Sequence, residues 1–278
     1  MKNSYIAFLL FTSLISFSQV KFESSLSEAF KKAKQQNKPV FVEYYNSDCT
    51  VCKRLGELLR TDSEVISYYN SNFINYAMNS FDELSDADNA LLTNANLHFN
   101  SVPVLLYFDK DKNFLHYSSG DISSQSVISE GKRATNPELN TVGLKVKYDA
   151  GDRTVRTLYA YCNLLIINKD EQKLNKVSQE LFESFPKAEL PTKKSYLILK
   201  RVVKTTDNGF FQYWINNLDK LKGFETSIHK DTEKSHLKTI VLTELSSPDV
   251  KKWSEAKKAK FRDYITKLNI VDDPNVFF

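Results

Sequence analysis

The chain has 278 residues, of which 41% are hydrophobic and 26% charged, a balance that excludes both a disordered chain and a bundle of membrane helices. Seven glycines exclude a collagen-like protein, and three cysteines are too few for a disulfide scaffold. The formal net charge of +4 gives no argument for nucleic acid as a partner.

The first residues have the pattern of a cleaved secretory signal peptide. Lys2 is followed by the apolar run Ile6–Phe11, and small residues precede Gln19, the expected new N-terminus. The apolar stretch of about 12 residues is shorter than the ~20 that span a bilayer. We therefore expect residues 1–18 to be a signal peptide and the mature protein to be exported, to the periplasm rather than the external medium. The alternative is a buried first helix.

Helical and strand patterns alternate in residues 19–133. A capping box at Ser25 and Glu28 begins a helix that ends before Pro39. The other elements expected here are strands at 39–45, 73–78, 102–108 and 114–117, and helices at 49–59, 63–69, 86–95 and from about 123. A polar turn between the last two strands predicts a hairpin. The order of elements predicts an α/β sandwich with helices on both faces of a mixed sheet.

Strand patterns end near Pro137, and residues 134–278 are expected to form an all-helical domain. Apolar residues at helical spacing, separated by glycine and proline, predict helices at 152–167, 170–184, 191–204, 208–222, 231–245 and 248–268. They pair as successive helical hairpins without the residue signature of a tetratricopeptide repeat. A solenoid-like array and an irregular bundle both fit this pattern.

Charge divides the chain at nearly the same place. Residues 19–130 contain 10 Lys and Arg against 15 Asp and Glu, whereas residues 131–278 contain 27 against 19. Oppositely charged lobes can attract each other or steer an acidic partner. A solvated basic helical surface explains the same counts and is the interpretation that we favour.

Cys49 and Cys52 are the residues with the clearest chemistry. They stand three residues apart, directly after the strand that ends at Tyr45, where a helix is expected to begin. This spacing places both sulfur atoms on one helical turn, close enough to form a disulfide. A helix N-terminus favours a thiolate, so Cys49 is expected to attack and Cys52 to resolve the mixed disulfide. Such chemistry needs no metal and no organic cofactor.

The stretches around these cysteines resemble the thioredoxin-fold family. The likeness covers residues 25–130 and is carried by Lys38–Glu43, Asp48–Lys53 and Val102–Phe108. It is closest to the C-terminal thioredoxin-like domain of the periplasmic disulfide-bond reductant transporter. The resemblance implies a thioredoxin-like domain over residues 19–133 and says little about the helical region.

The resemblance also implies roles for single residues. The family's attacking and resolving cysteines correspond to Cys49 and Cys52. An acidic residue six positions before the first cysteine takes the proton of the resolving cysteine, and Glu43 occupies that position. The family's cis proline corresponds to Pro103, and the neighbouring backbone at Val102 would hydrogen-bond an extended substrate chain.

Residues beside the cysteines depart from the family pattern and are expected to modulate the site. Asp48 replaces the usual tryptophan and disfavours a Cys49 thiolate by like-charge repulsion, whereas Lys53 and the helix end favour it. Thr50 and Val51, between the cysteines, include neither glycine nor proline. We expect a thiolate less stabilised than in strong oxidants, and so a reducing couple.

Other interpretations of these residues stay open. The cysteine pair could be an inert structural disulfide. A disulfide that closes so short a loop, however, restricts the unfolded chain little and so adds little stability. A zinc site would need further ligands that the sequence does not offer at suitable spacing. Glu43 could be a salt-bridged or edge-facing residue. Cys162, within an apolar helical stretch, is expected to be a buried core thiol.

The resulting prediction is an exported thiol–disulfide oxidoreductase that reduces disulfides of other exported proteins. It implies disulfide-containing clients and a membrane or thioredoxin-like electron donor, with no nucleic acid partner. The helical domain would dock a client or partner, or form a homodimer. An isomerase is less favoured because the sequence does not show dimerisation. The alternative from another class is a helical protein-binding module whose thioredoxin-like scaffold carries an idle or structural disulfide.

Overall fold

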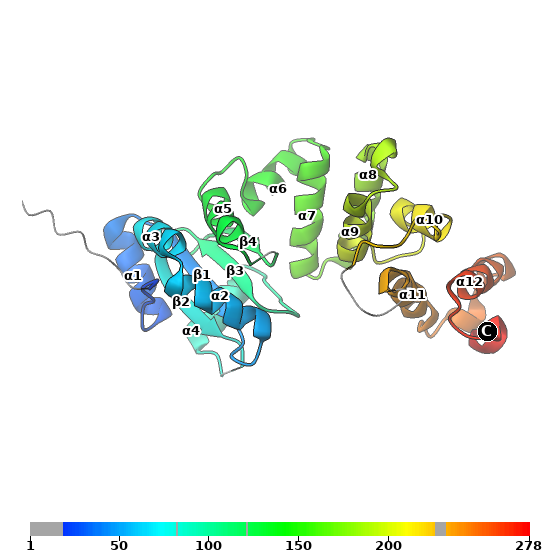
Figure 1. Cartoon of the computed structure of the whole chain (residues 1–278), viewed down its shortest axis with the longest axis horizontal. Helices are drawn as coiled ribbons and strands as arrows, with labels where there is room; N and C mark the ends of the chain where they lie inside the picture. Colours follow the sequence, from blue (N-terminus) through cyan, green and yellow to red (C-terminus); the bar gives the residue numbers. More distant parts are fainter. Residues whose placement is uncertain (1–18, 82, 121, 226–231) are drawn as a thin grey trace, which may run out of the picture. The chain divides into compact units, whose positions relative to one another are not determined.

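The computed structural model describes residues 19–81, 83–120, 122–225 and 232–278, so the expected signal peptide lies outside the described residues. The chain folds into two compact units (Figure 1). The first contains the described residues up to Leu91 together with Asn100–Asn136. The second contains Leu92–Phe99 and Pro137–Phe278, so one short segment within the expected first domain belongs to the helical unit.

The first unit is an α/β sandwich built on a four-stranded sheet. Its elements are α1 (Leu26–Gln36), β1 (Val40–Tyr45), α2 (Thr50–Thr61), α3 (Ser63–Asn72), β2 (Ile74–Asn79), α4 (Asp86–Asn94), β3 (Val104–Phe108), β4 (Phe114–Ser118) and α5 (Ser124–Ala134). The strand order is β2-β1-β3-β4, in which β1 and β2 are parallel and the other neighbours antiparallel. The predicted mixed sheet and the predicted hairpin of the last two strands are confirmed.

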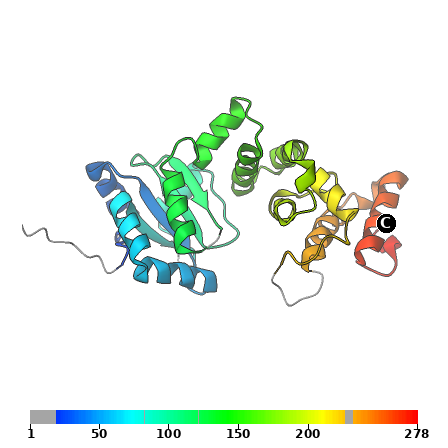
Figure 2. The same ribbon diagram turned by 45° about the horizontal axis from the view of Figure 1, so that its top comes forward.

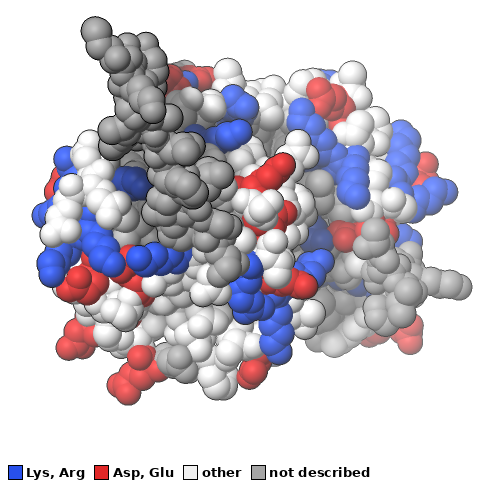
Figure 3. All heavy atoms as spheres, turned by 60° about the vertical axis from the view of Figure 1, so that its left-hand side comes forward, with Lys and Arg blue, Asp and Glu red and all other residues white. Residues whose placement is uncertain are grey.

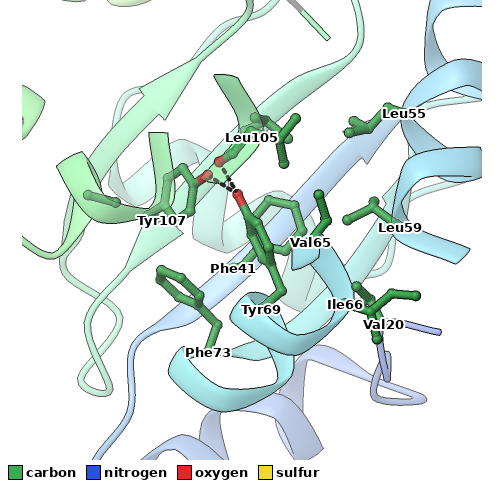
Figure 4. Packing of buried hydrophobic residues seen from close by; sticks show 12 residues of the cluster. Val20, Phe41, Leu55, Leu59, Val65, Ile66, Tyr69, Phe73, Leu105 and Tyr107 are labelled. Carbon is green, nitrogen blue, oxygen red and sulfur yellow. Dashed lines mark hydrogen bonds between the residues drawn. The ribbon is translucent and has the colours of Figure 1, made fainter. Parts of the chain in front are cut away.

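One face of this sheet packs against α2, α3 and α5, as the labels in Figure 1 and the rotated view in Figure 2 show. Phe41 of β1 and Tyr107 of β3 lie in this core with Tyr69 of α3 (Figure 4). The Tyr69 hydroxyl donates to the carbonyl oxygen of Val127 over 2.9 Å and lies 2.7 Å from the Tyr107 hydroxyl. The buried polar ends of both rings are therefore paired.

The other face packs against α1. Phe30 of α1 meets Phe108 of β3 edge to face, with ring centroids 6.4 Å apart. Because side chains alternate along a strand, β1 and β3 supply apolar residues to both cores and are almost fully buried. The apolar and aromatic run at 39–45 that predicted this strand is thus explained by burial of both its faces.

The described part of the second unit is helical. Its α-helices are α6 (Thr141–Asp149), α7 (Val155–Ile167), α8 (Glu171–Ser184), α9 (Lys193–Val202), α10 (Gly209–Ile215), α11 (Thr232–Leu245) and α12 (Glu255–Leu268). No helix among the described residues combines the length and the apolar character that crossing a membrane requires. Whether the helices form a repeating array stays a prediction.

One α-helix of this unit was not predicted, and the helices predicted at 208–222 and 248–268 are shorter in the structure, the second beginning only at Glu255. Helix α6 was not predicted because its apolar residues stand at every second position, which is not a helical stripe; Val142 and Val146 are 37% and 61% exposed in the structure. The helix predicted at 208–222 ends at Ile215, where Asn216 caps it and its N–H binds the carbonyl oxygen of Trp214. Residues beyond Asn216 continue as turns, although they include the buried Leu221.

Charged side chains of both signs are interspersed on the face of the molecule drawn in Figure 3. Charged side chains also form ion pairs within single helices, such as Lys145 with Asp149 in α6 and Lys267 with Asp263 in α12. Exposed pairs of this kind contribute little to stability. The arrangement is that of a solvated charged surface.

Candidate active site

Cys49 is the residue that caps the N-terminus of α2. Its backbone is extended, with φ −78° and ψ 119°, and its sulfur accepts the backbone N–H of Cys52 at 3.2 Å. This bond satisfies one of the amides that every helix leaves unpaired at its start. The Cys49 thiol is half-buried, whereas that of Cys52, one turn inside, is 3% exposed. The sulfur of Cys49 is thus accessible, and the sulfur of Cys52 is shielded from solvent.

The two thiols have opposite pKa shifts. Burial opposes ionisation of Cys49, but hydrogen bonds from Cys52 and from the backbone of Val51, together with the charge of Lys53, lower its pKa below the ordinary value of 9.0. The pKa of Cys52 is raised to about 11 by burial, by its hydrogen bond with Cys49 and by the charges of Cys49 and Glu43. Cys49 therefore ionises first, while Cys52 keeps its proton.

Glu43 lies in the centre of the sheet, beneath α2. Its side chain is 6% exposed and shares the face of β1 with Phe41, between Ala77 of β2 and Leu105 of β3 in the strand register. Burial raises the pKa of Glu43 to about 7, against the opposing charge of Arg60. The edge-facing interpretation of this residue is wrong, because β1 has a neighbour on both sides.

A cavity of about 450 Å³ connects Glu43 with the buried cysteine and is partly open to solvent. Its walls come from the N-terminal segment, from β1 and the loop after it, from α2 and from β2. The lining residues are Gln19, Val20, Phe22, Glu43, Tyr45, Asn46, Ser47, Cys52, Lys53, Gly56, Leu59, Arg60 and Ala77. A buried carboxyl and a buried thiol therefore share a space that water can enter.

The loop before β3 reaches the attacking sulfur. The Val102–Pro103 peptide bond is cis, as predicted, and Pro103 is buried. The Cys49 thiol donates a hydrogen bond of 3.7 Å to the carbonyl oxygen of Val102. A sulfur bonded to Cys49 would therefore lie beside the backbone of this loop.

The residues predicted to modulate the site surround the start of α2. Asp48 is exposed, and its N–H donates to the Asn46 side chain at 2.8 Å. Thr50 and Val51 are exposed on the first turn of α2, and Lys53 lines the rim of the cavity. All four expected modulators are thus gathered within one turn of Cys49.

Gly56 and Arg60 are cavity residues that the sequence analysis missed. The available signal was their spacing, because Cys52, Gly56 and Arg60 succeed one another at intervals of four along a helix. The third cysteine, Cys162, lies apart from the site in α7, where it is fully buried and burial raises its pKa to about 12. Its expected role as a core thiol is confirmed.

A comparison with protein families identifies the fold of the first unit. A family model described as a thioredoxin-like domain matches residues 26–130. A solved structure of a proposed disulphide-isomerase from Bacteroides thetaiotaomicron is 24% identical with a TM-score of 0.36, covering 43% of this chain and 95% of its own. A second, described as DsbH oxidoreductase, is 18% identical with a TM-score of 0.37, covering 47% of this chain and 94% of its own.

No curated protein sequence gave a significant match. The family match, the strand order and the helices on both faces of the sheet agree with one another. Residues 26–130 of this chain are a thioredoxin-like domain.

Proposed function

We propose that this chain is an exported thiol–disulfide oxidoreductase that reduces disulfides of other exported proteins. One observation carries the proposal: the half-exposed Cys49 sulfur caps α2 and accepts the Cys52 N–H at 3.2 Å, with its pKa lowered. A thiolate at an accessible helix N-terminus is the nucleophile that disulfide exchange requires. The match to a thioredoxin-like domain over residues 26–130 supports the same chemistry.

In the first step, the Cys49 thiolate attacks one sulfur of a client disulfide. The client S–S bond breaks, a bond between Cys49 and that sulfur forms, and the second client sulfur leaves as a thiolate that takes a proton from water. The Val102 backbone, 3.7 Å from the Cys49 sulfur, is placed to pair with an extended client segment.

In the second step, Cys52 resolves the mixed disulfide. Its thiol gives a proton to the ionised Glu43 carboxylate, and its sulfur attacks the Cys49 sulfur. The bond between Cys49 and the client breaks, and the client sulfur leaves as a thiolate that takes a proton from water. Two electrons have then passed to the client, and the Cys49–Cys52 disulfide must be reduced by an external dithiol donor. Without a negative charge on Cys49, one of the effects that raise the Cys52 pKa is removed, so the proton transfer becomes easier at this stage.

The reducing direction and the export are further parts of the proposal. We expect the exposed Asp48 beside Cys49 to disfavour a thiolate there by like-charge repulsion, and strong oxidants are those that stabilise the thiolate most. The N-terminal residues have the composition of a signal peptide. An exported reductase needs a membrane or thioredoxin-like donor, and we assign to the helical unit the docking of a client or partner, or homodimerisation.

Reduction of insulin disulfides by the full chain tests this proposal, with dithiothreitol as the electron source. We expect activity in the parent and loss of turnover in Cys49→Ser. In a separate experiment without dithiothreitol, reduced Cys52→Ser mixed with exported proteins should accumulate a mixed disulfide that identifies clients by mass spectrometry. A parent without activity would instead favour the other candidate, a helical binding module on a thioredoxin-like scaffold with idle cysteines.

A further inference from the structure

Cys52, Gly56 and Arg60 form a row along one face of α2, and all three line the cavity that contains Glu43. Side chains of a helix tilt toward its N-terminus, so the long Arg60 side chain extends back toward Cys52. Its Nη1 atom lies 3.9 Å from the position that a Cβ atom of residue 56 would take. The Arg60 guanidinium is therefore folded over Gly56.

Gly56 is not explained by packing. A glycine within a helix is less favourable than alanine, and a Cβ atom at this position would meet no heavy atom closer than the Arg60 Nη1. The backbone at this position is ordinary helix, without a positive φ. A methyl group at this position would make only an ordinary van der Waals contact with Arg60, whereas a larger side chain would occupy the place of the guanidinium.

The charges around Glu43 come mainly from α2. That helix contributes Cys52, Lys53 and Arg60 to the cavity, and β1 itself adds Tyr45. The neighbouring strands contribute only apolar residues at this level, Ala77 of β2 and Leu105 of β3. Arg60 is the group whose charge opposes the effect of burial on the Glu43 carboxyl.

We propose that Arg60, seated over Gly56, is a positioning residue that stabilises the ionised Glu43 carboxylate during proton transfer from Cys52. This inference rests on the proposed function. It identifies Arg60 as the residue whose charge favours proton transfer in the second step of that function. The proton moves from the Cys52 sulfur to a Glu43 oxygen and then to water in the cavity. Arg60 gains and loses no proton, and it contacts neither client nor reacting sulfur.

Stopped-flow reaction of the reduced full chain with dithiobis(nitrobenzoate) separates the two steps. Attack by Cys49 releases one thionitrobenzoate, and attack by Cys52 on the resulting mixed disulfide releases a second. The first phase reports the nucleophile of the proposed function. The second phase, measured as a function of pH, reports proton transfer from Cys52 to Glu43.

In Arg60→Gln we expect the pH midpoint of the second phase to move to higher pH, because Glu43 loses a favourable charge. Below the midpoint the second phase should slow about threefold, the effect of half a pKa unit, while the first phase is unchanged. Arg60→Lys should restore most of the parental profile. Since Arg60 is exposed, salt at about 1 M should reduce the difference between parent and Arg60→Gln.

Arg54→Gln is the matched control, because Arg54 is an exposed cation of α2 that does not line the cavity. Gly56→Leu is a second test, since its side chain would displace Arg60 and should shift the profile as Arg60→Gln does. Equal midpoints for parent and Arg60→Gln, or an equal shift in Arg54→Gln, would overturn the inference while leaving the two phases intact. Absence of both phases would contradict the proposed function itself.

Discussion

The thiol of Cys49 and the carbonyl oxygen of Val102 lie 3.7 Å apart, joining the start of α2 to the loop before β3. A sulfur hydrogen bond of this length is weak. It matters here because it shows that the Cys49 sulfur lies close to the backbone of Val102. A client sulfur bonded to Cys49 must lie against the backbone that can pair with the client chain. In the proposed function, the nucleophile and the backbone that pairs with the client would therefore share one surface.

The contrast between the two thiols predicts selective labelling. With limiting iodoacetamide at neutral pH, we expect the reduced protein to be modified at Cys49 at least about tenfold faster than at Cys52, because the thiolate is the reactive form. Cys162 should react only after unfolding, since it is fully buried. Peptide mass spectrometry locates the label, and faster modification of Cys52 would contradict the assignment of the nucleophile.

Burial of Glu43 predicts a pH-dependent stability. Its pKa is about 7 when folded and 4.5 ordinarily, so between these values the folded state holds a proton that the unfolded state has lost. The parent should therefore lose stability as pH rises from 5 to 8, by about 2 to 3 kcal/mol. In Glu43→Gln, the free energy of unfolding measured in urea should not fall in this way between pH 5 and 8. Glu57→Gln, at an exposed position of α2, is the control and should behave as the parent does.

The hydroxyl pair beneath α3 predicts unequal effects of two similar substitutions. Tyr69 donates to the Val127 carbonyl, so Tyr107 donates to Tyr69. Tyr69→Phe removes the bond to Val127 and leaves the buried Tyr107 hydroxyl without its acceptor, and should cost about 1 to 3 kcal/mol of unfolding free energy. Tyr107→Phe keeps the bond to Val127 and should cost less. Equal losses in chemical denaturation would contradict this order of donors.

The sequence predicted the thioredoxin-like unit well because its signals are local. The run from Val40 to Tyr45 is apolar and β-branched, Pro39 precedes it, and the cysteines follow at a helix start, so strand, helix and attacking sulfur could all be placed. The place of Glu43 beneath the cysteines came from the resemblance to the thioredoxin-fold family, because the strand pattern alone left an edge-facing side chain open.

What the sequence could not give depends on contacts distant along the chain. The segment Leu92–Phe99 belongs to the helical unit, where the His98 N–H donates to the Ile167 carbonyl oxygen at 2.8 Å, and no local pattern encodes that bond. The spacing in the sequence does not by itself distinguish Arg60 from a surface cation. Its position over Gly56 and beside the cavity follows only from the folded structure.

A redox titration of the full chain against glutathione, read by differential alkylation and mass spectrometry, tests the account most directly. We expect Cys49 and Cys52 to interconvert together between dithiol and disulfide in one two-electron transition. The potential should lie closer to the about −270 mV of thioredoxin than to the about −120 mV of the strongest periplasmic oxidant. A cysteine pair that stays in one state across the whole range of buffers would contradict the central claim.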